Sequence, residues 1–270
     1  IIDGDRCWWY IDNELVQSVM DAGCALMIFN RTELAADRGT FRDTPLKDSR
    51  TGGLWDVYPD YGFGALSAWA WGYHRCIDIL ESIDLIDNSR IAVTGHSFGG
   101  FTTLAVGAGF ENAAGSVPAD ERVDALIPLA PASSALTRDE LAGIAAPLLV
   151  MVGTNDQTTP ANPNVDVIWE NVSSDPLHRA DLVDAQHQTF SDACAYLEFV
   201  PQLPEPNELV IEVVEELGAE GCSPGDMPTE RAQDLTNTLA VTFLDSVFRG
   251  GEMITEDNTE IPDDLLFETR

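Results

Sequence analysis

Ser97 lies in the sequence GHSFGG (residues 95–100), a Gly-x-Ser-x-Gly pattern. An apolar strand is expected just before it, at Ile91 to Thr94. A helix of small and apolar residues is expected just after it, from about Phe101 to Ala108. This order is typical of a nucleophile elbow, a tight turn that raises a serine oxygen above the edge of a sheet. A serine held in this way attacks a carbonyl carbon once a base removes its proton. The pattern therefore indicates acyl-transfer chemistry, and the alternative is a glycine-rich turn without catalysis.

The residues around Ser97 have predicted tasks of their own. Gly95 and Gly99 are expected to be glycines because side chains there would collide with the neighbouring strand and helix. The N-terminus of the following helix favours negative charge beside the serine. The backbone N–H of Phe98 is the predicted donor to the oxyanion that forms when the serine attacks.

The chain offers four histidines as the base: His74, His96, His178 and His187. His187 is the predicted base because it comes after the last candidate strand, where the order Ser, Asp, His of such hydrolases requires it. His178 is the alternative, although it is also readable as a solvated loop residue. His96 is expected to point away from the serine and pack, and His74 to be a structural histidine on a helix.

Asp156 is the predicted acid that orients the histidine. It follows the apolar strand LLVMV (residues 148–152) and precedes a turn, which is where an acid of this kind is expected. The alternatives are Asp124 and Asp184, neither of which directly follows a strong strand. Asp156 is also readable as an aspartate that only caps a turn.

Apolar strands that alternate with helices predict a mostly parallel sheet covered by helices on both faces. The expected strands, besides that before Ser97, are Cys24 to Phe29, Ala125 to Leu129, Leu148 to Val152 and, more weakly, Ala180 to Val183. The expected helices, besides that after Ser97, are residues 12–22, 65–82 and 229–249. The fold class predicted from this pattern is α/β.

Residues 1–270 are predicted to form a single domain. The polar stretch Asn30 to Gly64 is expected to run over one end of the sheet, and the stretch 201–228, rich in Pro, Glu and Gly, to be a loop excursion. An earlier strand that would carry the first oxyanion donor is not found. Either the N-terminus is truncated or Ile1 to Trp9 takes that role, so the first donor is unassigned.

The charge limits the partners. The chain has 46 Asp and Glu against 14 Lys and Arg, a formal net charge of −32. Nucleic acids and anionic membrane surfaces would be repelled. No apolar run approaches the roughly 18 residues that span a bilayer, so membrane insertion is not expected. The acidity indicates either a solvated surface or adaptation to high salt, as in a halophilic or marine source. The five cysteines lack metal-site spacing, and no metal or organic cofactor is predicted.

The sequence around these residues resembles known families. GHSFGG and its flanks are similar to bacterial dienelactone-hydrolase-like esterases, relatives of platelet-activating-factor acetylhydrolase among the α/β-hydrolases. The further matching segments, within about residues 86–250, are 88–91, 101–104, 120–123, 146–149, 153–156 and 187–194. This resemblance implies an α/β-hydrolase fold and the catalytic triad Ser97, Asp156 and His187.

The first third resembles a different branch. Residues 29–38 (FNRTELAADR) and 64–72 (GALSAWAWG) are similar to glucuronoyl esterases of plant-cell-wall degradation. That family typically has Arg after the nucleophile and often a Lys or polar residue beyond the glycines. Phe98 and Phe101 take those places here, a departure that argues against a sugar-ester substrate.

The resemblance also suggests a disulfide between Cys194 and Cys222, which would hold the His187 loop and fit a secreted or periplasmic enzyme. Two unpaired buried thiols are the alternative. The predicted function is a serine carboxylic-ester hydrolase that acts on short-chain aliphatic or aryl esters, with polyesters among the candidates. The alternatives are a glucuronoyl esterase and a catalytically inactive binding protein of the same fold. The oligomeric state is left open.

Overall fold

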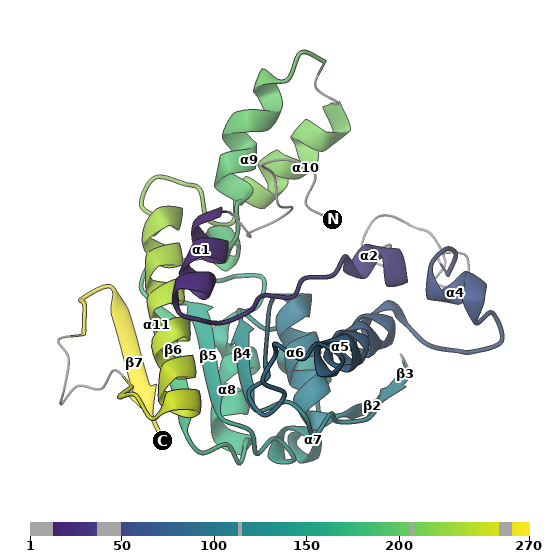
Figure 1. The fold of residues 1–270 in the computed structure, drawn as a ribbon. Coiled ribbons are helices and arrows are strands. Elements are labelled where there is room, and N and C mark those ends of the chain that lie inside the picture. The colour runs from purple at the N-terminus through teal and green to yellow at the C-terminus, as the bar shows by residue number, and fades with distance from the viewer. Residues whose placement is uncertain (1–12, 37–49, 113–114, 206–207, 254–260) are drawn as a thin grey trace.

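A computed structural model of the chain describes residues 13–36, 50–112, 115–205, 208–253 and 261–270. The main sheet of this part has five strands in the order β1-β4-β5-β6-β7 (Figure 1). The strands are β1 (Ala92–His96), β4 (Ala125–Leu129), β5 (Leu148–Gly153), β6 (Leu177–Leu182) and β7 (Leu265–Thr269). All neighbours pair in parallel except β6 and β7, which are antiparallel. A separate antiparallel hairpin joins β2 (Phe110–Asn112) and β3 (Gly115–Val117).

Each face of the sheet has its own hydrophobic core. Along β5, Leu148 and Val150 enter one core, whereas Leu149 and Met151 enter the other. Every residue of β5 is buried, as expected for a parallel strand covered on both sides. The helices over the first face are α5 (Ala65–Glu81), α6 (Phe98–Ala108), α7 (Arg138–Ala142) and α8 (Ala161–Asn171). The second face is covered by α11 (Thr229–Arg249), against which α1 (Asn13–Asp21) packs.

This arrangement confirms the predicted fold class, a mostly parallel sheet with helices on both faces as in the α/β-hydrolases. The predicted bounds of β4 and α11 coincide with those observed. Several of the observed elements were not predicted from the sequence, among them α7, α8, α9 (Ala193–Phe199) and β7. The single-domain organisation of residues 1–270 stays a prediction.

The prediction of a buried strand from Cys24 to Phe29 is wrong. The segment has no regular structure and links α1 to α2 (Arg31–Leu34), and Met27 and Ile28 are 36% and 49% exposed. A strand needs a hydrogen-bonding neighbour, and no strand of the described sheet pairs with this segment. Phe29 instead packs edge-on against Tyr73 of α5. Apolar composition alone therefore misled the prediction.

The stretch 201–228, expected to be a loop excursion, contains the helix α10 (Glu208–Gly218). Val210, Val213, Val214 and Leu217 recur at helical spacing, a signal that the surrounding Pro, Glu and Gly residues obscured. Helix α10 packs against α9, and Figure 1 shows the two helices projecting together above the carboxyl ends of the parallel strands. No helix in the described ranges is long and apolar enough to cross a membrane.

Candidate active site

Ser97 occupies the turn between the end of β1 and the start of α6. Its φ of 59° and ψ of −118° are sparsely populated for a residue with a side chain, and such strain costs on the order of 1–3 kcal/mol. Two backbone hydrogen bonds hold the turn: Ser97 N–H donates to Leu129 O (2.9 Å), and Ala132 N–H donates to Ser97 O (3.2 Å). Local structure thus forces the serine into a position that its own preferences disfavour.

The positions of the motif that have no room for a side chain differ in part from those predicted. A Cβ on Gly95 would lie 2.5 Å from Gly99 O, so the prediction for Gly95 is confirmed. A Cβ on Gly99 would meet nothing within 4 Å, so the prediction for Gly99 is wrong. Gly100 is the tighter position, because a Cβ there would lie 2.9 Å from Pro131 Cα. The helix thus approaches the chain after β4 most closely at the second glycine of the pair.

The structure brings Ser97, His187 and Asp156 together from three separate loops. His187 Nε2 lies 2.9 Å from Ser97 Oγ, and His187 Nδ1 lies 2.9 Å from Asp156 Oδ2. The partners assign the tautomer: Nδ1–H donates to the carboxylate, and Nε2 accepts from the serine hydroxyl. Each of His187 and Asp156 is only 2% exposed. This arrangement can remove the serine proton and stabilise the charge that the imidazole then carries.

The carboxylate of Asp156 is fully hydrogen-bonded. Its Oδ1 accepts from the backbone N–H groups of Thr158 (2.9 Å) and Thr159 (2.7 Å), and its Oδ2 lies 3.0 Å from Thr159 Oγ1. Burial raises the pKa of this carboxyl, but the hydrogen bond and charge of His187, with the Thr159 contacts, outweigh it and lower the pKa below its usual value. Asp156 is therefore ionised at neutral pH.

Thr159 is a site residue that the sequence analysis missed. Its Oγ1 also lies 3.0 Å from His187 Nδ1 and 2.9 Å from Ala130 O. The hydroxyl thus contacts the acid, the base and the loop after β4. The available signal was the Asp-x-Thr-Thr sequence, in which an aspartate accepts hydrogen bonds from the residues two and three positions later.

The loops that carry Asp156 and His187 are joined to one another. They follow β5 and β6, which are neighbours in the sheet. Thr154 N–H donates to Leu182 O and Asn155 N–H donates to Ala185 O, each at 2.9 Å. A Cβ on Gly153 would lie 2.2 Å from Ala185 O, so only glycine allows this approach. The parallel register of two strands therefore sets the distance between the acid and the base.

His96 packs against His187 and bonds to its backbone. It is 5% exposed, its ring centroid lies 4.6 Å from that of His187, and its Nε2 lies 2.9 Å from His187 O. Burial, followed by the charge of His187, lowers the pKa of His96 to about 3. The ring is therefore neutral, and its Nε2–H donates to the carbonyl of the residue that carries the base. The prediction that His96 points away from the serine and packs missed this contact.

The other candidates lie in structural contacts. His74 Nδ1 is 3.2 Å from Asp120 Oδ2. His178, predicted as a solvated alternative base, is instead 3% exposed on β6 and bonded through Nδ1 to the hydroxyl of Thr269. Asp124 Oδ2 accepts from Ile91 N–H at 2.9 Å, at the opposite end of β4 from the serine.

The backbone N–H of Phe98, the predicted oxyanion donor, stays a prediction. Phe98 is the first residue of α6, and the first N–H groups of a helix have no acceptor within the helix. This backbone N–H is therefore available beside Ser97. The first donor stays unassigned, because Ile1 to Trp9, the segment considered for that role, lies outside the described residues.

A disulfide joins Cys194 to Cys222, as the family resemblance suggested. Cys194 is in α9, which follows the turn with the base, and Cys222 comes just after α10. Gln188 N–H donates to Glu220 O (2.8 Å), and Thr158 Oγ1 donates to Glu220 Oε2 (2.7 Å). The segment closed by the disulfide thus contacts both the acid loop and the base loop. No group of three His, Cys, Asp or Glu side chains within the described ranges is placed to hold a metal ion.

Comparisons with known proteins concern the first part of the chain. The sequence model of the family "Glucuronyl esterase, fungi" matches residues 8–120. A 4-O-methyl-glucuronoyl methylesterase of Hypocrea jecorina is 38% identical over 91 residues, and that of Podospora anserina is 35% identical over 91 residues. Each alignment covers 32% of this chain and 18% of the relative. The 4-O-methyl-glucuronoyl methylesterase 1 of Wolfiporia cocos is 35% identical over 89 residues, 20% of its length.

The matches support a carboxylesterase-like hydrolase. The matched residues 8–120 include Ser97 and the turn that carries it, but neither Asp156 nor His187. They agree with the resemblance of the first third to glucuronoyl esterases. They do not bear on the dienelactone-hydrolase-like resemblance of residues 86–250.

Proposed function

We propose that this protein is a serine carboxylic-ester hydrolase in which Ser97 is the nucleophile, His187 the general base and Asp156 the orienting acid. The observation that carries the proposal is the continuous pair of 2.9 Å contacts from Ser97 Oγ through the imidazole to the carboxylate. A buried, ionised aspartate beside the Nδ1–H keeps Nε2 free to accept the serine proton.

The mechanism proceeds in two halves. His187 takes the proton as Ser97 Oγ attacks the ester carbonyl, and the Phe98 N–H donates to the oxygen that becomes negative. The imidazolium then protonates the departing alcohol, which leaves an acyl-enzyme. Water, deprotonated by the same imidazole, attacks the acyl carbon and releases the acid and the free serine.

The substrate we propose is an ester of a glucuronic acid. The support is the similarity of residues 8–120 to the glucuronyl esterase family and to methylesterases named for 4-O-methyl-glucuronoyl esters. This choice of substrate follows the resemblance of the first third of the chain to glucuronoyl esterases, and it replaces the prediction of a short-chain ester as the first candidate.

Short-chain aliphatic or aryl esters are the second candidate, and a specific observation favours them. Phe98 packs on an apolar cluster that includes Trp69. It stands at the position after the nucleophile, where glucuronoyl esterases typically have Arg. An apolar wall beside the nucleophile suits an apolar acyl group. The two candidates differ in which ester has the higher kcat/KM: methyl 4-O-methyl-glucuronate or p-nitrophenyl butyrate.

The Ser97→Ala variant tests the proposal. We expect kcat to fall at least about a thousandfold, because removal of the nucleophile of a triad leaves only the remaining binding contacts. Hydrolysis of both esters is measured together with the thermal unfolding midpoint, which should not fall. The matched control is Ser134→Ala, which removes an exposed serine near the site.

Unchanged turnover in Ser97→Ala would reject the assignment of the nucleophile. A wild-type protein that hydrolyses neither ester and does not react with a fluorophosphonate would support the remaining alternative, an inactive binding protein of this fold. The disulfide supports a secreted or periplasmic location, because such bonds persist in oxidising compartments.

A further inference from the structure

An aromatic pocket lies on the loop around α4 (Leu54–Val57), away from the triad residues in the sequence. Its lining residues are Arg50, Trp55, Asp56, Tyr58, Pro59 and Tyr61, and its volume is about 560 Å³. That volume is within the range of sites that bind small molecules. The described contacts of the proposed mechanism use none of these residues, so the pocket needs a separate explanation.

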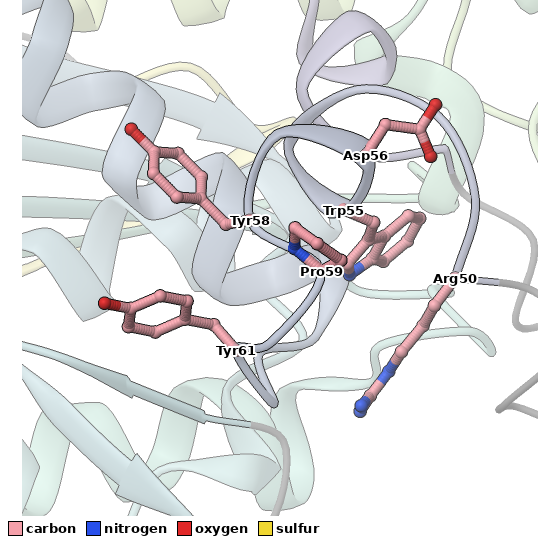
Figure 2. Close-up of a pocket in the computed structure, with 6 residues that line it drawn as sticks. All are labelled: Arg50, Trp55, Asp56, Tyr58, Pro59 and Tyr61. Atoms are coloured by element: carbon pink, nitrogen blue, oxygen red, sulfur yellow. The ribbon is translucent and has the colours of Figure 1, made fainter.

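The pocket presents aromatic rings to solvent. Tyr58 and Tyr61 are 46% and 70% exposed, and their ring centroids lie 6.0 Å apart at an interplanar angle of 83°. Figure 2 shows both rings extending to the same side of the loop, with Pro59 between them and Trp55. Trp55 is 7% exposed, stacks on Phe63 at 6.3 Å and donates from its indole N–H to Phe63 O. A fixed indole thus supports two solvent-exposed rings.

The loop is anchored to the body of the protein. Gly53, the N-cap of α4, lies so close to α2 that a Cβ there would be 2.3 Å from Leu34 O. Trp55 belongs to a small apolar cluster with Trp69, and Phe98, the residue after Ser97, packs on the same cluster. The pocket is therefore built on the cluster that supports the nucleophile turn.

Arg50 gives the pocket one positive charge that can bind a carboxylate. Within the described residues, Arg50 makes no ion pair or hydrogen bond, although the chain has a net charge of −32. Asp56 does not neutralise it: one carboxylate oxygen accepts from Gly52 N–H at 2.9 Å, and Figure 2 shows the charged ends of Arg50 and Asp56 directed away from each other. An unpaired guanidinium in so acidic a protein is the natural partner of a carboxylate.

We propose that this pocket is a second binding site for an acidic glycan, a polysaccharide segment that bears uronic acid carboxylates. Sugar C–H groups stack on the negative faces of Tyr58 and Tyr61, while Arg50 binds a carboxylate and Asp56 accepts from sugar hydroxyls. The choice of a glycan rests on the proposed function, because the substrate proposed there is an ester of a sugar acid. The pocket would hold the polysaccharide while another residue of it reaches Ser97.

Binding is measured by calorimetry in the Ser97→Ala background, so that no ester is turned over. The probes are a xylo-oligosaccharide that bears one 4-O-methyl-glucuronic acid and the neutral oligosaccharide of equal length. We expect Tyr61→Ala to weaken binding of both probes at least fivefold. Arg50→Gln should weaken the acidic probe to the affinity of the neutral one. The matched controls are Phe199→Ala, an exposed ring on α9, and Arg138→Gln, an arginine on α7.

The proposal is overturned if the Ser97→Ala protein binds neither probe, if the pocket variants bind as tightly as their parent, or if the controls lose affinity equally. In the wild-type background, the pocket variants should hydrolyse p-nitrophenyl butyrate at an unchanged rate. The wild-type protein could fail to hydrolyse a glucuronoyl ester while the pocket variants still lose glycan binding. That result would refute the proposed substrate and keep the pocket as a binding site. If the protein hydrolyses that ester but the pocket variants bind the glycan as tightly as their parent, the pocket site is refuted and the proposed substrate is kept.

Discussion

His96 shows how a residue next to the nucleophile in sequence contributes to the base instead. Its neutral imidazole donates to the backbone carbonyl of His187 at 2.9 Å, and the two ring planes are tilted by 38° relative to one another. Thr159 similarly contacts both the base and the acid. The orientation of the imidazole therefore depends on two further residues besides the carboxylate: His96 at the end of β1 and Thr159 on the loop after β5.

The buried His96 makes stability depend on pH in a predictable direction. Its pKa in the folded protein is about 3, against an ordinary value of 6.5. Between these values the unfolded chain binds more protons, so the free energy of unfolding falls as the pH drops below 6.5. The contribution of one such group reaches about 1.4 kcal/mol per pH unit. Well above pH 6.5, His96 is neutral in both the folded and the unfolded chain, so it does not lower the free energy of unfolding there.

The His96→Phe variant should therefore lose less stability in acid than the wild type. Urea unfolding at pH 7.5 and pH 5 is expected to show a decrease about 2 kcal/mol smaller in the variant. At pH 7.5 the variant should itself be less stable by about 1–3 kcal/mol, because the carbonyl of His187 loses its donor. Parallel pH profiles for the two proteins would contradict the buried, neutral state of His96.

The elements that matter most are β5 and β6, whose loops carry the acid and the base. Their parallel pairing runs from Leu148 with Leu177 to Gly153 with Leu182, so the two loops leave the sheet side by side. Hydrogen bonds between the loops continue the contact beyond the strands. Gly153 is the position where this contact allows no side chain.

Gly153→Ala tests this element-scale coupling. The added Cβ would lie 2.2 Å from Ala185 O, a backbone atom that cannot move away without shifting the loop that leads to His187. We expect a loss of stability of about 1–3 kcal/mol and a kcat at least about tenfold lower, because small displacements of reacting groups are costly. Gly62→Ala is the control, since a Cβ there meets nothing within 4 Å. Equal behaviour of the two variants would refute the coupling.

At the scale of the whole molecule the dominant feature is charge. A net charge of −32 on 270 residues opposes the compact state through self-repulsion. Several arginines are shared between carboxylates, as Arg122 is between Asp78, Glu81 and Asp120, but 14 cations cannot pair with 46 anions. Most of the repulsion must therefore be screened by the solution.

Salt should accordingly stabilise the protein. The Debye length falls from about 10 Å at 0.1 M salt to about 3 Å at 1 M, which removes most repulsion between surface carboxylates. We expect the unfolding midpoint to rise by about 5 °C or more between 0.1 and 1 M NaCl. KCl should raise the midpoint as much as NaCl does, because both salts screen the surface charges equally at the same ionic strength. A constant or falling midpoint would argue against adaptation to high salt.

Local sequence patterns were sufficient to predict which residues meet in the site and which strands lie next to them. The GHSFGG turn, the strand before Asp156 and the late position of His187 are local patterns, because a buried parallel strand and a nucleophile turn each leave a continuous signature. The order of those patterns was enough to predict the fold class and to select His187 over the other histidines.

The further residues that complete the site could be identified from the folded chain alone. The contacts of Thr159 and His96, the fit at Gly153 and Gly100, and the pocket at Tyr58 and Tyr61 depend on segments far apart in the chain. The failed prediction of a strand at residues 24–29 has the same origin: a strand exists only where another strand supplies its hydrogen bonds. A run of apolar residues indicates that a segment tends to be buried, but it does not indicate whether a neighbouring strand is present to pair with it.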